Sequence, residues 1–215
     1  MRAGRDPAEV RVVAVSKTVG EPEVREALAQ GAGTFGENRP ELLAAKATAF
    51  PQVAWHMIGN IQSRKIPQIV EHAALIHSVC EMRHMERIDR AAAAIAKVQD
   101  VLVEVNVSGE NSKSGLAPSE VEAFVLESLA FQNVRVCGLM TMAPLGLPDE
   151  ALNTFQGLAD VHRRVRAAIV EQEGEERAQA FRELSMGMTD DWPQAVACGA
   201  TIVRIGRAIF PPAEE

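Results

Sequence analysis

Short apolar segments rich in β-branched residues alternate with longer segments of helical periodicity along the whole chain. The apolar segments predict eight strands, at residues 12–15, 34–35, 53–58, 74–79, 101–107, 134–139, 181–185 and 201–205. The segments between them predict helices at residues 22–30, 37–50, 62–71, 81–98, 118–131, 148–172 and 190–198. Residues 174–176 are polar and are expected to form a solvated loop.

Regular alternation of strands and helices predicts an α/β fold with a parallel sheet and right-handed crossovers. Eight repeats favour a closed (β/α)8 TIM barrel, and an open doubly wound sheet is the alternative. The pattern contains no linker or second domain, so residues 1–215 are predicted to form a single barrel domain.

The composition narrows the classes of partner and compartment. The chain has 215 residues and a formal net charge of -7, which does not favour binding to nucleic acid or to an anionic membrane. The apolar runs are too short for a membrane span, and the first residues do not resemble a secretory signal. Three widely spaced cysteines argue against a disulfide framework, so a cytoplasmic location is expected.

Lys17 is the sharpest candidate for chemistry, because it directly follows the first predicted strand. In a barrel, functional groups gather at the C-terminal ends of the strands, so Lys17 is expected at the mouth. We expect a dehydrated side chain there, because burial favours the neutral amine, which can attack an aldehyde. The alternative is an ordinary lysine that reaches solvent or pairs with a carboxylate.

Two glycine-containing turns near the C-terminus predict a phosphate site. Ser185, Met186, Gly187 and Thr189 follow the seventh strand, and Gly206 and Arg207 follow the eighth. Thr189 and Asp190 are candidate N-caps for the next helix, whose first N–H groups favour an anion. In this barrel the loops after strands seven and eight commonly hold phosphate.

Arg204 lies inside an apolar strand and needs a buried acceptor. That acceptor is either a core carboxylate, for which Glu104 and Glu183 are candidates, or a heteroatom of a ligand. The five histidines show no metal-binding spacing, so no metal site is predicted.

Eight motifs in order resemble the pyridoxal phosphate homeostasis protein family over about residues 4–210. They are residues 14–18 (AVSKT), 35–38 (FGEN), 55–59 (WHMIG), 62–63 (QS), 111–115 (NSKSG), 138–140 (GLM), 184–191 (LSMGMTDD) and 203–206 (VRIG). The resemblance implies a barrel like the N-terminal domain of alanine racemase. It also implies that pyridoxal 5'-phosphate (PLP) is held as a Schiff base on Lys17.

The same resemblance implies the remaining site residues. Residues 185–189 and Gly206 with Arg207 would hold the phosphate, and Arg204 would face the pyridine nitrogen. Asn38, His56 and Asn60 would line the pocket. The chain departs from the family in its early first strand, in Asn60 and in Arg207, where the family typically has threonine.

The chemistry favours a cofactor carrier over an efficient enzyme. A guanidinium does not release a proton to the pyridine nitrogen, so the ring stays a weak electron sink. Racemisation typically needs a second base, and the chain contains no tyrosine. The prediction is therefore a protein that buffers PLP or delivers it to PLP-dependent apo-enzymes, and the family resemblance implies a monomer. The alternatives are a low-activity amino-acid racemase and a cofactor-free aldolase acting through Lys17.

Overall fold

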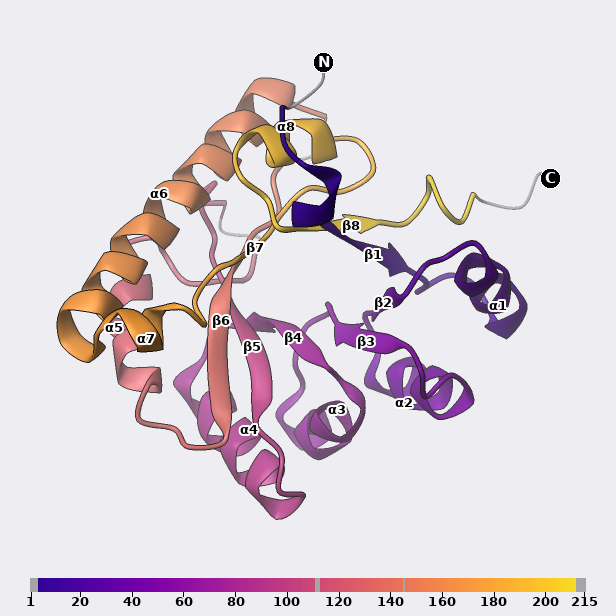
Figure 1. Cartoon of the computed structure of the whole chain (residues 1–215), viewed down its shortest axis with the longest axis horizontal. Coiled ribbons are helices and arrows are strands. Elements are labelled where there is room, and N and C mark those ends of the chain that lie inside the picture. Colours follow the sequence, from indigo (N-terminus) through magenta and orange to yellow (C-terminus); the bar gives the residue numbers. More distant parts are fainter. Residues whose placement is uncertain (1–3, 111–112, 145, 212–215) are drawn as a thin grey trace.

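The computed structural model describes residues 4–110, 113–144 and 146–211, so residues 111 and 112 of the 111–115 motif lie outside the described part. Eight parallel strands follow one another around a closed barrel, and the last pairs with the first (Figure 1). The predicted TIM barrel is therefore confirmed, and the alternative of an open sheet is wrong. The strands are β1 (Arg11–Val15), β2 (Thr34–Glu37), β3 (Ala54–Met57), β4 (Leu75–Val79), β5 (Gln99–Glu104), β6 (Val134–Met140), β7 (Glu183–Ser185) and β8 (Ile202–Ile205).

Helices surround the strands on the outside (Figure 1). They are α1 (Glu21–Ala29), α2 (Pro40–Ala49), α3 (Ile66–His72), α4 (Met82–Ala94), α5 (Val121–Ser128), α6 (Pro148–Glu173), α7 (Glu175–Ala178) and α8 (Trp192–Ala197). Two 3-10 turns, η1 (Pro7–Glu9) and η2 (Ser63–Lys65), precede β1 and α3. Among the described helices, none combines the length and the apolar character needed to cross a bilayer.

The periodicity of α4 illustrates how the sequence places these helices. Met85, Ile88 and Ala92 are fully buried and recur every three or four residues, so one stripe of the helix packs on the barrel. The helix ends at Ala94, short of the predicted residue 98. Ala96 has a φ of 52°, which is incompatible with a continuing α-helix.

Two other expectations about local structure were wrong. Residues 174–176 are not simply a loop, because Glu175 begins the short helix α7 after Gly174, whose φ of 88° ends α6. The seventh strand begins at Glu183 and not at residue 181. Phe181 is buried in the core and its ring stacks on that of His162 in α6, so its apolar character reflects core packing.

The barrel interior is apolar in the middle and polar toward both ends. A small cluster fills the middle, and its members are Val13, Leu75, Leu102, Cys137, Met140 and Ile202. Gly36 leaves room for this cluster, since a Cβ there would lie 2.9 Å from Cγ1 of Val13. Buried polar side chains lie around the cluster, among them His77, Ser185 and Arg204.

Candidate functional site at the barrel mouth

Lys17 lies in the turn directly after β1, at the C-terminal end of the barrel. Its side chain is exposed, so the expectation of a dehydrated lysine was wrong for this structure. An exposed amine at the mouth is directly accessible to a ligand from solution, and its position after β1 is the one predicted.

The turn that carries Lys17 is held by a buried lysine. Lys46 of α2 donates hydrogen bonds to the carbonyl oxygens of Ser16 (2.8 Å) and Val19 (2.9 Å), which flank Lys17 in the sequence. It also donates to Oε1 of Glu37 at 2.5 Å, and Ser16 Oγ donates to the same oxygen at 2.6 Å. These bonds fix the backbone on both sides of Lys17, so its Cα has a defined position although its side chain is exposed.

Glu37 is completely buried at the end of β2. Its second carboxylate oxygen, Oε2, has no hydrogen-bond partner among the described residues. The pair with Lys46 is therefore the main compensation for this buried charge, and breaking it is expected to be costly.

Backbone N–H groups gather where β7 and β8 end. The bond from Arg204 N–H to the carbonyl oxygen of Gly187 (2.9 Å) holds these two strand ends side by side. Within the described part of the chain, the N–H groups of Gly187, Thr189, Gly206 and Arg207 have no hydrogen-bond acceptor. Unpaired N–H groups at two neighbouring strand ends favour an oxyanion such as a phosphate.

Gly187 is required for the shape of this turn. Its φ is 91°, and a Cβ there would lie 2.5 Å from Cβ of Ala195 in α8. Gly206 is less constrained, because the nearest atom to an added Cβ is Cβ of Val15 at 3.6 Å. The loop after β7 therefore depends on glycine more strictly than the loop after β8.

The two acidic residues of this loop, Asp190 and Asp191, have other partners than the sequence predicted. The N-cap of α8 is Asp191, so the prediction of Thr189 or Asp190 as the cap was wrong. Asp191 Oδ1 accepts the N–H of Met188 at 2.5 Å, which removes that donor from the phosphate site. Asp190 forms an exposed ion pair with Arg207, so part of the positive charge of Arg207 is already neutralised.

Arg204 is buried and points toward the mouth, because its partners lie at the ends of neighbouring strands. It donates to the carbonyl oxygen of Ser185 (2.9 Å), to Ser185 Oγ (2.7 Å) and to the carbonyl oxygen of Thr141 (3.0 Å). These acceptors are uncharged, so the alternative of a core salt bridge to Glu104 or Glu183 was wrong. Burial lowers the pKa of Arg204 to about 10, because the guanidinium has no carboxylate in direct contact.

A chain of hydrogen bonds runs from Arg204 into the barrel. Ser185 Oγ lies 2.9 Å from Nδ1 of His77, and Nε2 of His77 lies 2.9 Å from Nδ1 of His56. Burial lowers the pKa of both imidazoles, to about 3 for His56, so both are neutral. His56 therefore belongs to the interior of the barrel, and among the described residues it reaches the mouth only through this chain.

Asn38 and Asn60 are exposed at the rim, after β2 and β3. The loops that carry them touch, because the position of a Cβ on Gly59 would lie 2.2 Å from the carbonyl oxygen of Asn38. Ser78 Oγ donates to the carbonyl oxygen of Gly59 at 2.5 Å and holds the same loop from the β4 side. The rim position predicted for Asn38 and Asn60 agrees with this arrangement, and their contact with a ligand stays a prediction.

Sequence reasoning missed the roles of Lys46 and His77. Lys46 lies in an ordinary helical segment, and nothing in its neighbourhood marks it as buried. His77 lies in a strand that is buried at every position, and a polar residue in such a strand is a signal that a polar interior follows. That signal indicates burial, but only the barrel brings His77 to Ser185.

The comparisons with known proteins agree with this architecture. Residues 1–212 match the sequence model of the family described as alanine racemase, N-terminal domain, which defines the class of barrel. A protein of Pseudomonas aeruginosa named pyridoxal phosphate homeostasis protein is 38% identical over 210 residues, 97% of this chain and 86% of its own length. One of the same name from Synechocystis is 33% identical over 95% of this chain and 92% of its own length.

A solved structure of a relative has the same fold. PipY of Synechococcus elongatus, solved with PLP bound, superposes with a TM-score of 0.81 at 35% identity, and the match covers 97% of this chain and 95% of PipY. The chain thus belongs to the pyridoxal phosphate homeostasis protein family, as the motif resemblance predicted.

Proposed function

We propose that this protein binds pyridoxal 5'-phosphate at the barrel mouth through Lys17, and buffers or delivers the cofactor. The observation that carries the proposal is the set of unpaired N–H groups at Gly187, Thr189, Gly206 and Arg207, beside the strand that leads to Lys17. The relative solved with PLP bound supports the same ligand.

The described residues fit the three chemical handles of this ligand. PLP carries three such groups, which are an aldehyde, a phosphate and a ring nitrogen. A neutral amine attacks the aldehyde with loss of water. Lys17 offers the amine, and the four N–H groups offer donors to the phosphate. Arg204 offers donors to the ring nitrogen, because its three bonds use only three of its five N–H groups.

Neighbouring groups near the mouth favour carriage over catalysis. Burial raises the pKa of the Cys80 thiol, so it remains protonated at neutral pH. His77 uses both ring nitrogens in hydrogen bonds to Ser185 and His56. Neither group is therefore placed as the second base that racemisation typically needs, and the chain contains no tyrosine.

The test is reconstitution of the purified protein with PLP, followed by absorbance, borohydride reduction and mass spectrometry. The wild type is expected to become yellow and to carry one reduced adduct, located on Lys17. Lys17→Ala is expected to lose the colour, whereas Lys113→Ala, which removes a lysine paired with Glu110, is expected to keep it. A colourless wild type, or an adduct on another lysine, would overturn the proposal.

A second measurement separates carriage from racemisation. We expect loaded protein to activate a PLP-dependent apo-enzyme and to leave the Cα hydrogen of alanine or serine unexchanged in deuterium oxide. Sustained exchange that depends on Lys17 would instead support a low-activity racemase. A monomeric state, a cytoplasmic location and the identity of the receiving apo-enzymes remain predictions from the sequence.

A further inference from the structure

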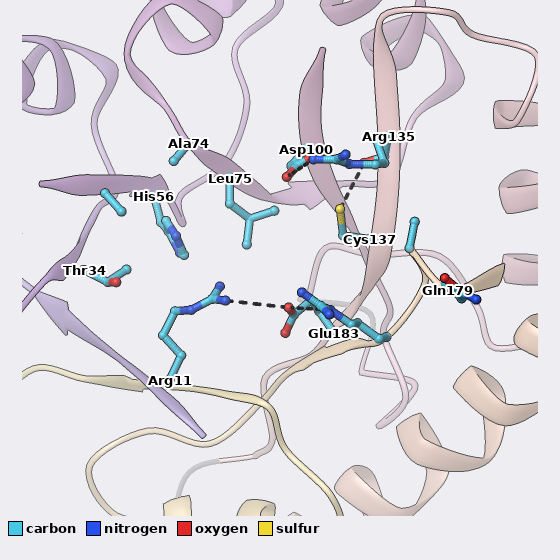
Figure 2. Close-up of a pocket in the computed structure, with 13 residues that line it drawn as sticks. Arg11, Thr34, His56, Ala74, Leu75, Asp100, Arg135, Cys137, Gln179 and Glu183 are labelled. Atoms are coloured by element: carbon cyan, nitrogen blue, oxygen red, sulfur yellow. Dashed lines mark hydrogen bonds and ion pairs between the residues drawn. The ribbon is translucent and has the colours of Figure 1, made fainter. Parts of the chain in front are cut away.

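A cavity of about 490 Å³ lies at the N-terminal face of the barrel, opposite the mouth. The residues that begin the strands surround it, including Arg11 of β1, Thr34 of β2, Leu75 of β4 and Glu183 of β7 (Figure 2). The proposed PLP site lies at the other ends of the same strands, so this cavity is a separate place on the molecule.

The charged residues of the cavity are unequally paired. Asp100 and Arg135 form a closed bidentate pair, with N–O distances of 2.6 and 2.9 Å. Glu183 has two arginines near it, Arg11 at 3.8 Å and Arg182 at 3.6 Å, and these distances are too long for hydrogen bonds. Three guanidinium groups therefore face two carboxylates, which leaves one excess positive charge in the cavity.

Glu183 is held away from tight pairing with these arginines. Its Oε2 accepts the hydroxyl of Thr201 at 2.6 Å, and its side chain is only 12% exposed. The Arg11 and Arg182 side chains are 45% and 76% exposed, so both can turn toward an incoming anion. A ligand carboxylate could thus take the hydrogen bonds that Glu183 leaves unmade.

His56 adds a neutral donor at the inner wall of this cavity. The residue is 3% exposed, and its ring lies beside Leu75 at the cavity (Figure 2). Nδ1 is bound to His77, and Nε2 has no acceptor among the described residues. A buried imidazole with one ring nitrogen unpaired at a cavity wall is a site for a ligand acceptor.

The hydrogen-bond chain assigns the hydrogen of His56 to that free nitrogen. Ser185 Oγ accepts from Arg204, so its own hydrogen goes to Nδ1 of His77. His77 then donates from Nε2 to Nδ1 of His56, which leaves the hydrogen of His56 on Nε2. The opposite direction would leave the Ser185 hydroxyl hydrogen without an acceptor among the described residues.

We infer that this cavity binds a small organic carboxylate, held by Arg11, Arg182 and Nε2–H of His56, with its carbon chain against Ala54, Ala74 and Leu75. The apolar residues line the same cavity as the arginines, which favours a carboxylate with a short carbon chain over inorganic phosphate. The chain from His56 to Arg204 connects this site with the proposed PLP site, so occupancy of one is expected to alter the other. Only this coupling rests on the proposed function.

Isothermal titration of the PLP-free full chain with butyrate tests binding itself. We expect saturable binding of one butyrate per chain, and weaker binding of inorganic phosphate. Arg182→Ala and Arg11→Ala are each expected to weaken binding by about tenfold, the loss typical of one charged hydrogen bond. Arg163→Ala, which removes an exposed arginine of α6, is the charge-matched control and should bind as the wild type does.

Three outcomes would overturn the inference. They are a titration that does not saturate, equal weakening in the Arg163→Ala control, and full mutual exclusion of butyrate and PLP, which would place the carboxylate at the mouth. A separate measurement addresses the coupling: saturating butyrate should shift the absorbance of PLP-loaded wild type but not of His56→Phe. If butyrate binds but no shift occurs, the second site stands and the coupling is wrong.

Discussion

Lys46 and Arg204 are both buried cations, but they lie in different surroundings. Lys46, near β1 and β2, contacts a carboxylate and two carbonyl oxygens, which match the three hydrogens of its ammonium group. Arg204, on β8, contacts only uncharged oxygens, and these occupy three of its five donors. The region around Lys46 is complete without a ligand, whereas the region around Arg204 has donors left for one.

This difference separates a structural role from a binding role. In a buried ion pair each charge compensates the other, so removing one member leaves the other charge buried without a partner. A buried cation without a carboxylate in contact bears a desolvation cost, which the lowered pKa of Arg204 records. Such a cost is expected where a protein holds a charge for a ligand.

The largest expected effect comes from Lys46→Met. The substitution leaves Glu37 buried without its cation, so we expect the free energy of unfolding to fall by about 3–5 kcal/mol. Urea denaturation measures this change. The control is Lys65→Met, which breaks a pair with exposed Glu41 and should change the stability little. Equal losses in the two variants would contradict the structural role of Lys46.

Gly187→Ala is expected to have the next largest effect. The alanine must adopt a φ of 91° and must displace Ala195, so we expect a loss of about 2–4 kcal/mol in unfolding free energy. Gly206→Ala meets only ordinary contacts and should cost less than about 1 kcal/mol. Thermal and urea unfolding compare the two, and PLP titration should show weaker binding for Gly187→Ala. A Gly206→Ala variant as unstable as Gly187→Ala would argue against the difference between the two loops.

Acid is expected to destabilise the folded chain, because the interior histidines are held neutral in it. The pKa of His56 is about 3 in the folded chain against 6.5 for the free side chain, so between these values the unfolded chain binds more protons. Stability should therefore fall as the pH decreases from 6.5 toward 3, by about 1.4 kcal/mol per pH unit for this histidine. The measurement is urea unfolding at pH 7.5 and 4.5.

The His56→Gln variant isolates this contribution from those of other groups. His77 and His162 have lowered pKa values and act in the same direction, whereas the raised pKa of buried Glu104 opposes them above pH 4.5. The difference between the wild type and His56→Gln at each pH removes the contributions of His162 and Glu104, which are common to both proteins, and leaves those of His56 and of His77, which contacts it. The same loss on acidification in both proteins would show that His56 is not held neutral.

The smallest expected effect comes from Arg204→Met, and it sharpens the comparison most directly. Three hydrogen bonds are lost, but so is a buried charge without a carboxylate partner, so we expect a net loss of about 1–2 kcal/mol. Urea denaturation should therefore rank Arg204→Met well below Lys46→Met. Reconstitution should still attach PLP to Lys17, with a shifted absorbance maximum. Destabilisation as large as that of Lys46→Met would remove the distinction between the two cations.

Much of the mouth could be predicted because strand order and loop position follow from local pattern. Lys17 follows β1 and the turns at Gly187 and Gly206 follow β7 and β8, so a parallel barrel places them at one end whatever the details. Local pattern did not give the exposure of Lys17, the cap at Asp191 or the pairing of Arg207 with Asp190. Each of these depends on side-chain geometry within a few ångströms, which periodicity does not encode.

The sequence by itself determined the repeating strand and helix pattern, the family and the position of Lys17 after the first strand. These properties are encoded in local periodicity and in motifs that lie close together along the chain. Only the tertiary structure decided which polar groups meet inside the barrel. His56, His77, Ser185 and Arg204 come from β3, β4, β7 and β8, and Lys46 reaches Ser16 across 30 positions of sequence. Closing the barrel brings them within hydrogen-bond distance because buried polar groups must find partners there, and sequence separation does not limit that choice.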